Sequence, residues 1–394
     1  MNKNQEPLFY SQLECPVCKT MNEYENVKTG SYTEDGRDTD FRPTGRIWLN
    51  PAYEKYDPLL FFMATCRKCF YTREFNHDYK KWQQDVSFKT YRLKNLQSKY
   101  LNELSKEDGI IRFLGNHINQ EKYPFESAVI KFLLGIYSVK LSGRPPQLDL
   151  GRYFLRIGWL FRSQAGDEPS EGKGSANLFS QLRSAVQSAK LKLPEFEQEI
   201  GNIRKMLDHD FPILFENAPE ADQYRQNIQQ AISGISSEYD SLINATSELE
   251  NVLGEAEKTL LGADLPTDEP GFFEFGSFTE FLRKAGEGWA EVPFSENDAM
   301  RKAAEYYQKA YEAGAEISKG IQQIQAAYMI AELSRRIGEV DNANQYFNQT
   351  IRMGREIVIG KKGDKSTINF TQKLLDTAMQ QARLNKKESE GVTS

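Results

Sequence analysis

The sequence predicts a mainly α-helical protein that begins with a small head containing β-strands. Three observations support this fold class. Two Cys-x-x-Cys pairs lie near the N-terminus, an apolar heptad follows residue 220, and small and large apolar residues recur at helical-repeat spacing near the C-terminus. We therefore expect a head followed by antiparallel helical hairpins and one long coiled-coil-like segment.

The chain has four cysteines, in the pairs Cys15 with Cys18 and Cys66 with Cys69. A Cys-x-x-Cys turn places both sulfurs on one side of the backbone, so two such turns offer four thiolates to one tetrahedral Zn²⁺. No ligand position is left for water or substrate, so we expect a structural zinc ion and a zinc-ribbon-like head over residues 1–78.

Basic residues lie beside the cysteines. Four thiolates and one Zn²⁺ carry a formal charge of −2, which Lys19, Arg67 and Lys68 are placed to offset, so we expect these three residues to surround the site. The 47 residues between Cys18 and Cys66 exceed the usual gap of a compact ribbon, which requires an inserted hairpin or loop.

Two other roles for the cysteines stay open. They could form a redox dithiol or a disulfide, or remain unpaired structural thiols. Against these roles, the chain has no secretory signal, few cysteines for its length, and no βαβ pattern around either pair. The longest apolar runs are too short to span a bilayer, so we expect a soluble cytoplasmic protein.

Charge is distributed unevenly along the 394 residues, which should hold two or three domains. Residues 1–165 carry 25 Lys and Arg against 19 Asp and Glu, whereas the rest of the chain carries 25 against 37. The basic excess is concentrated in residues 61–100, with nine basic and three acidic residues. A nucleic-acid contact there would use Arg67, Lys68, Arg73, Lys80, Lys81 and Trp82.

In the head, residues 8–13 and 23–27 are expected to be short strands on either side of the first cysteine pair. Residues 29–51 are rich in Gly, Asp, Thr and Arg and are expected to form a loop. The apolar run 59–64 has the length of a strand that leads into Cys66.

Several of these motifs occur in a fixed order. They are Cys15-Pro16-x-Cys18, Asp38-Thr39-Asp40-Phe41, the turns Asn50-Pro51 and Asp57-Pro58, a short apolar strand, and a second Cys-x-x-Cys followed by Phe70. Over about residues 10–165 this set resembles a bacterial family of uncharacterised, domain-of-unknown-function proteins. The resemblance implies a zinc-knuckle head with a tetratricopeptide-like helical tail, and it transfers no catalytic residue.

Residues 79–165 are expected to form a helical domain. Apolar residues in 88–104 have the spacing of a basic amphipathic helix. Residues 126–164 have the spacing of two helices, which a Gly-Arg-Pro-Pro break separates. The basic face of the first helix could remain in water, contact nucleic acid, or meet an acidic protein. Residues 166–175 read as a linker.

Residues 175–262 form the long-helix region. An apolar seam with steps of four and three runs from Ile228 to Leu260 and has one polar residue, Thr246. A helix over 221–261 would be about 60 Å long. It must pack on the helices before it as a hairpin, or on another copy as a dimer, and both arrangements stay open.

Residues 263–385 contain an aromatic-rich connection and then a repeat. Five phenylalanines between 272 and 281 could pack into the core or form an exposed docking motif. The tetratricopeptide pattern is matched by Ala327, Ile330, Ala331, Gly338, Ala343, Phe347 and Thr350, and in part 40 residues upstream. A final helix is expected over 368–384, and residues 386–394 are expected to be a disordered tail.

No catalytic constellation is evident, because no phosphate loop, dinucleotide fingerprint or nucleophile elbow occurs. Asp38 and Asp40 could act as acid and base, but two acids in a turn more often cap backbone N–H groups. We expect a non-enzymatic scaffold that binds a protein or peptide through its helical-repeat surface, with self-association through 221–261 as one option. The alternative is a nucleic-acid-binding protein that uses segment 61–100.

Overall fold

The computed structural model describes residues 7–75, 79–143, 145–165, 196–210, 221–261, 271–361 and 363–391, together with positions 186, 190, 193 and 194. Residues 1–165 and 268–394 form one compact unit, and residues 166–267 form a second. The fold is mainly α, with small antiparallel hairpins at its N-terminal end, as the sequence predicts. The predicted linker 166–175 lies outside the described residues.

Three two-stranded antiparallel hairpins build the head. They are β1 (Leu8–Glu14) with β2 (Met21–Val27), β3 (Tyr32–Arg37) with β4 (Pro43–Trp48), and β5 (Met63–Thr65) with β6 (Thr72–Glu74). The β3–β4 hairpin replaces the predicted loop over 29–51. The strand β3 is mostly exposed and β4 buries only Trp48, so the sequence carries little alternation of apolar and polar residues.

The apolar run before the second cysteine pair is only in part a strand. Two 3₁₀ turns come first, η2 (Pro51–Tyr53) and η3 (Pro58–Phe61). Asn50 and Asp57 begin these turns, because each side chain accepts a hydrogen bond from the backbone N–H two residues later. The strand β5 then starts at Met63, so the predicted strand over 59–64 is shortened by the helical turn.

Four helices follow the head: α1 (Leu93–Ser105), preceded by the π-helical turn η5 (Phe88–Arg92), α2 (Ile110–Asn116), α3 (Pro124–Lys140) and α4 (Gln147–Ala165). The sequence predicts α1, α3 and α4 but not the short α2. The helix α3 is apolar on nearly all sides and lies in the core, against β5 and β6 on one side and α4 on another.

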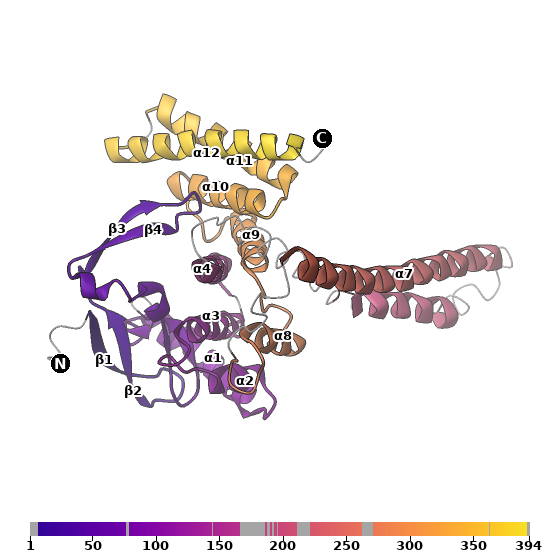
Figure 1. The fold of residues 1–394 in the computed structure, drawn as a ribbon, viewed down its shortest axis with the longest axis horizontal. Coiled ribbons are helices and arrows are strands. Elements are labelled where there is room, and N and C mark those ends of the chain that lie inside the picture. The colour runs from indigo at the N-terminus through magenta and orange to yellow at the C-terminus, as the bar shows by residue number, and fades with distance from the viewer. Residues whose placement is uncertain are drawn as a thin grey trace. The chain divides into compact units, whose positions relative to one another are not determined.

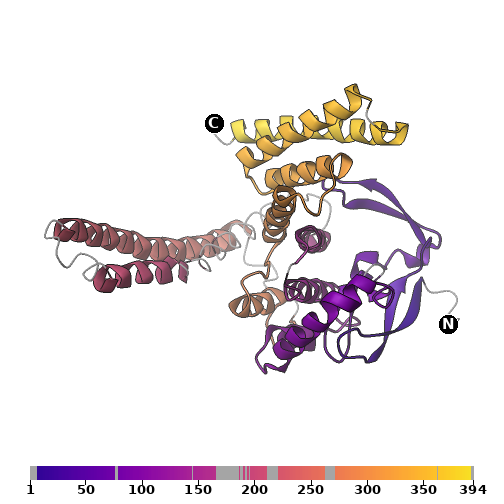
Figure 2. The same cartoon turned by 180° about the vertical axis from the view of Figure 1, so that it is seen from behind.

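The C-terminal helices complete this unit. They are α8 (Phe278–Gly288), α9 (Glu296–Ala313), α10 (Ile321–Arg336), α11 (Val340–Ile359) and α12 (Lys365–Gly391). The helix α9 packs along α4, and α10, α11 and α12 stack at the end of the unit opposite the β1–β2 hairpin (Figures 1 and 2). The repeat positions Ala327, Ala331, Ala343 and Phe347 are fully buried, and Gly338 turns the chain at φ 79°.

The predicted disordered tail is corrected in part, because α12 continues through Gly391. Glu388 forms an ion pair of 3.1 Å with Arg335 of α10 and so holds the last turns in place. The predicted division of the chain into a head, a first helical domain and a repeat domain stays a prediction. No helix among the described residues combines the length and apolar content that crossing a bilayer requires.

The second unit contains α7 (Ala221–Leu261), which has the predicted bounds. Before it, residues 196–205 are helical and end in the π-helical turn η6 (Met206–Asp210). The Tyr239 hydroxyl donates to the Leu193 carbonyl at 2.9 Å, and Arg204 donates to Ser236. Within this chain α7 therefore packs on the segment before it, which is the predicted hairpin.

The aromatic cluster 272–281 packs into the core, which decides between its two predicted roles. Phe272 and Phe281 are fully buried, and the Phe281 ring stacks on Phe113 of α2 at 5.0 Å. The His117 side chain lies among these rings, and its Nε2 is 3.0 Å from Glu274. Phe273 is the most exposed of the five.

Candidate metal centre

The two Cys-x-x-Cys turns close two hairpins in the same way. In each turn the N–H of the first cysteine donates to the carbonyl five residues later, and the N–H four residues later donates back to the carbonyl of that cysteine. The pairs are Cys15 with Thr20 and Lys19, and Cys66 with Tyr71 and Phe70, at 2.8–3.0 Å. Because the backbone repeats, both hairpins present their sulfurs in the same manner.

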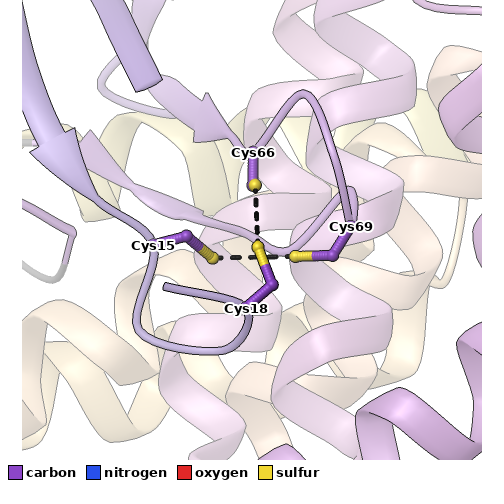
Figure 3. Close-up of side chains that lie close together, drawn as sticks. All are labelled: Cys15, Cys18, Cys66 and Cys69. Atoms are coloured by element: carbon purple, nitrogen blue, oxygen red, sulfur yellow. Dashed lines mark hydrogen bonds between the residues drawn. The ribbon is translucent and has the colours of Figure 1, made fainter. Parts of the chain in front are cut away.

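The four sulfurs point toward one another from the two turns (Figure 3). The Sγ atoms of Cys15 and Cys69 are 3.6 Å apart, those of Cys18 and Cys66 are 3.5 Å apart, and all four lie within 4.8 Å. A disulfide requires about 2.05 Å, so these are free thiols. A tetrahedral ion with bonds of about 2.3 Å separates its sulfurs by roughly 3.8 Å, so the four cysteines fit one metal ion.

The thiols differ in how readily they ionise. Hydrogen bonds from Cys15 and Cys69 lower the pKa of Cys66 well below its ordinary value. The hydrogen bond with Cys66 raises the pKa of Cys15 to about 12, and those with Cys15 and Cys66 raise the pKa of Cys69, while burial adds to both increases. Ionising the buried Cys15 and Cys69 thiols as well requires a compensating positive charge, which a bound metal ion would supply.

The side chains that contact the sulfurs differ from those predicted. Asn22 donates to the Cys66 sulfur at 3.4 Å, and its Oδ1 accepts from the Arg67 backbone N–H at 2.9 Å. Cys18 donates to Thr20 Oγ1 at 3.4 Å. A buried amide on the inward face of a strand was the available signal for Asn22, because such a group needs a partner.

Among the described residues, the side chains of the predicted basic neighbours make no hydrogen bond to the sulfurs, although the Lys68 backbone N–H donates to Cys66. The side chains of Arg67 and Lys68 are exposed to solvent. The Lys19 ammonium lies 4.3 Å from the Trp82 ring centre and 3.8 Å from Glu14. These cations therefore act on the charge of the site only at longer range, and water weakens that interaction because the cations lie at the protein surface.

The residue after each turn has a left-handed backbone, with φ 62° at Lys19 and 60° at Phe70. Glycine adopts this region without strain, and ribbons often carry it there. At Phe70 the ring packs against Gly115 of α2, where an added Cβ would lie 2.2 Å from the ring. The strained residue therefore joins the second cysteine turn to the helices.

The Asp38–Asp40 loop serves as an anchor. Asp38 accepts from the Thr39 N–H at 2.6 Å, and the fully buried Asp40 pairs with Arg162 of α4 at 2.9 Å. Burial opposes ionisation of Asp38, but Arg336 and Arg162 outweigh it and lower its pKa. Both carboxylates thus cap backbone N–H groups and bind arginines, which agrees with a structural role.

The same loop covers one face of α10. The Thr39 hydroxyl donates to Glu332 at 2.5 Å, and the Tyr328 hydroxyl donates to the Thr39 carbonyl at 2.8 Å. The Phe41 ring lies 5.6 Å from the Tyr328 ring. Residues separated by almost 300 positions meet here, so the head and the C-terminal helices share one packed interface.

The basic segment 61–100 is divided by the fold. Lys80 and Lys81 are exposed, and so are Arg67 and Lys68 beside the second cysteine turn. Trp82 is only 8% exposed, and its indole N–H donates to the Glu14 carbonyl at 2.9 Å. Its ring is therefore unavailable for stacking on a base, and the exposed groups of the predicted contact set are its cations.

Two hairpin turns carry four cysteines around one point and are joined to a mainly helical remainder. The class of this protein is therefore a helical protein with a cysteine-rich head that could hold one metal ion. The chain belongs to the family described as "Uncharacterized protein conserved in bacteria (DUF2225)", which matches residues 8–198 and 286–377. The matched segments include all four cysteines, and the interval 199–285 includes α7. Neither a curated protein nor a solved structure matches the chain.

Changing Asn22 to Ala should weaken metal binding about 10–100-fold, the usual loss when a group that orients a ligand is removed. The physical reason is the loss of the hydrogen bonds to the Cys66 sulfur and the Arg67 N–H. Competition with a chromophoric chelator measures the affinity. Arg67→Ala is the control, with an expected change below threefold, and an equal loss in both variants would contradict the assignment.

Changing Gly115 to Ala should destabilise the protein by about 1–3 kcal/mol, because the methyl group overlaps the Phe70 ring. Urea denaturation measures the free energy of unfolding. Gly288→Ala is a matched control, since a Cβ there meets nothing within 4 Å, and it should be neutral or slightly stabilising. Equal stability of the two variants would show that Phe70 is not fixed on α2.

Proposed function

We propose that this protein is a non-enzymatic interaction scaffold, stabilised by a structural Zn²⁺, that binds a protein partner through an exposed helical surface. The observation that carries the proposal is the apolar face of α7. Ile228, Ile235, Leu242 and Leu249 recur every seven residues and are 39%, 54%, 51% and 47% exposed. The alternate positions of the same seam are covered by other residues of the chain, since Ile232 and Leu253 are buried.

Zinc is the metal that the donor set favours. Four thiolates in a closed tetrahedral arrangement select Zn²⁺ or an iron–sulfur cluster, and sulfur spacings of 3.5–3.6 Å suit a single ion. Such an ion adds folding free energy and leaves no position for a substrate. This is why a structural role is proposed and a catalytic one is not.

Purified protein should contain one Zn²⁺ per chain by elemental analysis, and removal by a strong chelator should lower the melting temperature reversibly. Cys66→Ser should reproduce this loss, because it removes one thiolate from the site. Ser11→Ala, on β1 and away from the sulfurs, is a control that should retain the metal. Metal-free protein whose melting curve is insensitive to both chelator and added zinc would contradict the proposal.

The charge of α7 indicates which partner fits it. The helix carries seven Asp and Glu against two Lys and Arg. Two copies of such a helix repel each other, whereas a basic amphipathic helix pairs its cations with these acids and its apolar residues with the exposed stripe. We therefore propose a basic helical segment of another protein as the partner, and self-association is the competing outcome.

The tetratricopeptide character of α10 and α11 remains part of the proposal. The buried small residues and the turn at Gly338 support it. One face of α10 is already covered by the Asp38–Phe41 loop, so a partner that uses the repeat region would bind elsewhere on it. This is a second reason to place the binding surface on α7.

The double variant Ile235→Glu with Leu242→Glu should abolish capture of the partner, because both changes put charge into the apolar stripe. Affinity capture from the native cell, followed by fluorescence titration of the purified partner, should show a loss of at least 100-fold. Asn244→Glu, with exposed polar Asn244 outside the stripe, should bind normally. Equal binding by all three proteins would contradict the proposal, and dimerisation of wild type in sedimentation velocity would favour self-association.

Nucleic-acid binding is the second candidate, and the exposed Arg67, Lys68, Lys80 and Lys81 favour it. If the head binds nucleic acid, fluorescence anisotropy with DNA and RNA should show an affinity that falls steeply with salt. Lys80→Glu with Lys81→Glu should then lose binding, whereas Lys205→Glu with Lys373→Glu, the same change in charge elsewhere, should retain it. We expect no salt-dependent binding, and its detection would favour the second candidate.

A further inference from the structure

A cavity of about 520 Å³ lies between the head and α4, outside the metal centre. Its walls come from the β2–β3 turn, the β3–β4 hairpin, the start of η3 and one face of α4. These elements all belong to the same compact unit, and Figure 1 shows the hairpin and α4 within it. The volume lies within the range of pockets that hold small molecules, about 300–1,000 Å³.

The cavity is lined by an excess of cations. Lys28, Arg42, Arg46 and Arg156 face two acids, Glu34 and Asp57. Glu34 is partly neutralised by Arg37, which lies 3.1 Å away and outside the lining. Low-dielectric walls strengthen the positive potential of such a concave surface, so the cavity attracts an anion.

Arg156 has no ion-pair partner among the described residues. Its guanidinium lies 4.2 Å from the Phe62 ring centre, and it donates one hydrogen bond, to the Arg152 carbonyl at 3.3 Å. Burial lowers its pKa, and the attraction of the Glu74 carboxylate offsets this loss of water only in part. A desolvated guanidinium with free donors is a strong site for an oxyanion.

Arg46 provides a second group of donors. Its Nη2 lies 3.1 Å from Asp57, while its buried Nε has no acceptor in the described part of the protein. A buried donor without an acceptor destabilises the protein, and a ligand oxygen would satisfy it. Arg42, also in the lining, donates to Ser163 at 3.1 Å.

Aromatic side chains line the same cavity. Tyr32, Phe62 and Trp159 lie beside the arginines in its wall. The indole N–H of Trp159 is held by Asp40 at 3.1 Å, which fixes the orientation of the ring. Aromatic faces bind planar rings, and they add little to the binding of a bare inorganic ion.

We propose that this cavity binds a small organic phosphate with a planar ring, of the mononucleotide class, whose phosphate is held by Arg46 and Arg156. The N–H groups of a guanidinium match the geometry of phosphate oxygens. The aromatic side chains of the lining would contact the planar ring of the ligand. The proposal is independent of the partner that α7 binds and of the metal in the head.

Isothermal titration of the full-length zinc-loaded protein at constant ionic strength tests the proposal with four probes: adenosine monophosphate, guanosine monophosphate, inorganic phosphate and adenosine. At least one nucleotide should bind with micromolar affinity, phosphate at least tenfold more weakly, and adenosine not measurably. No binding of any phosphate would overturn the site. Nucleotide binding no tighter than phosphate binding would overturn the ring assignment.

Arg46→Gln and Arg156→Gln should each weaken nucleotide binding at least tenfold, and Arg283→Gln, at an exposed position of α8 outside the lining, should leave it unchanged. Asp57 keeps its hydrogen bond to the Leu59 N–H without Arg46, so Arg46→Gln should retain the fold if Arg156→Gln does not. Circular dichroism checks each variant. An equal loss in Arg283→Gln and Arg46→Gln would indicate non-specific attraction to surface charge and overturn the proposal.

Discussion

The organisation of the head depends on two hairpin turns that bring four sulfurs to one point. Both hairpins also place side chains in the main core, although β5–β6 is only three residues long on each side. An ion held by the four cysteines would join the two turns directly. The segment between them, with its β3–β4 hairpin, must therefore leave the site and return to it.

Buried ion pairs connect the head to the helices. Arg162 of α4 contacts Asp38, Asp40 and Glu296, and the fully buried Glu332 of α10 lies between Arg335 and Arg336. Leaving any of these charges unpaired in the interior is costly, so each pairing allows few alternative positions. These ion pairs consequently fix the position of the head relative to α4, α9 and α10.

Local spacing made much of the fold predictable. The knuckles, the bounds of α7 and the burial of Ala327 and Phe347 all follow from periodicities within a few tens of residues. The β3–β4 hairpin was missed because β3 is mostly exposed and only Trp48 of β4 is buried, so apolar and polar residues hardly alternate. Asn22 and the Arg162 ion pairs were missed because their partners lie 44 or more residues away, where one sequence gives no signal. The predicted role of Lys19, Arg67 and Lys68 in offsetting the charge of the site stays a prediction.

The contact between Thr39 and Glu332 also affects how the chain can be made. The two residues are 293 positions apart, so at roughly 5–20 residues per second the ribosome needs about 15–60 s to deliver the second after the first. During this interval the apolar side of α4 lacks α9, and the Asp38–Phe41 loop lacks α10. The emerging N-terminal segment therefore exposes apolar surface until synthesis is nearly finished.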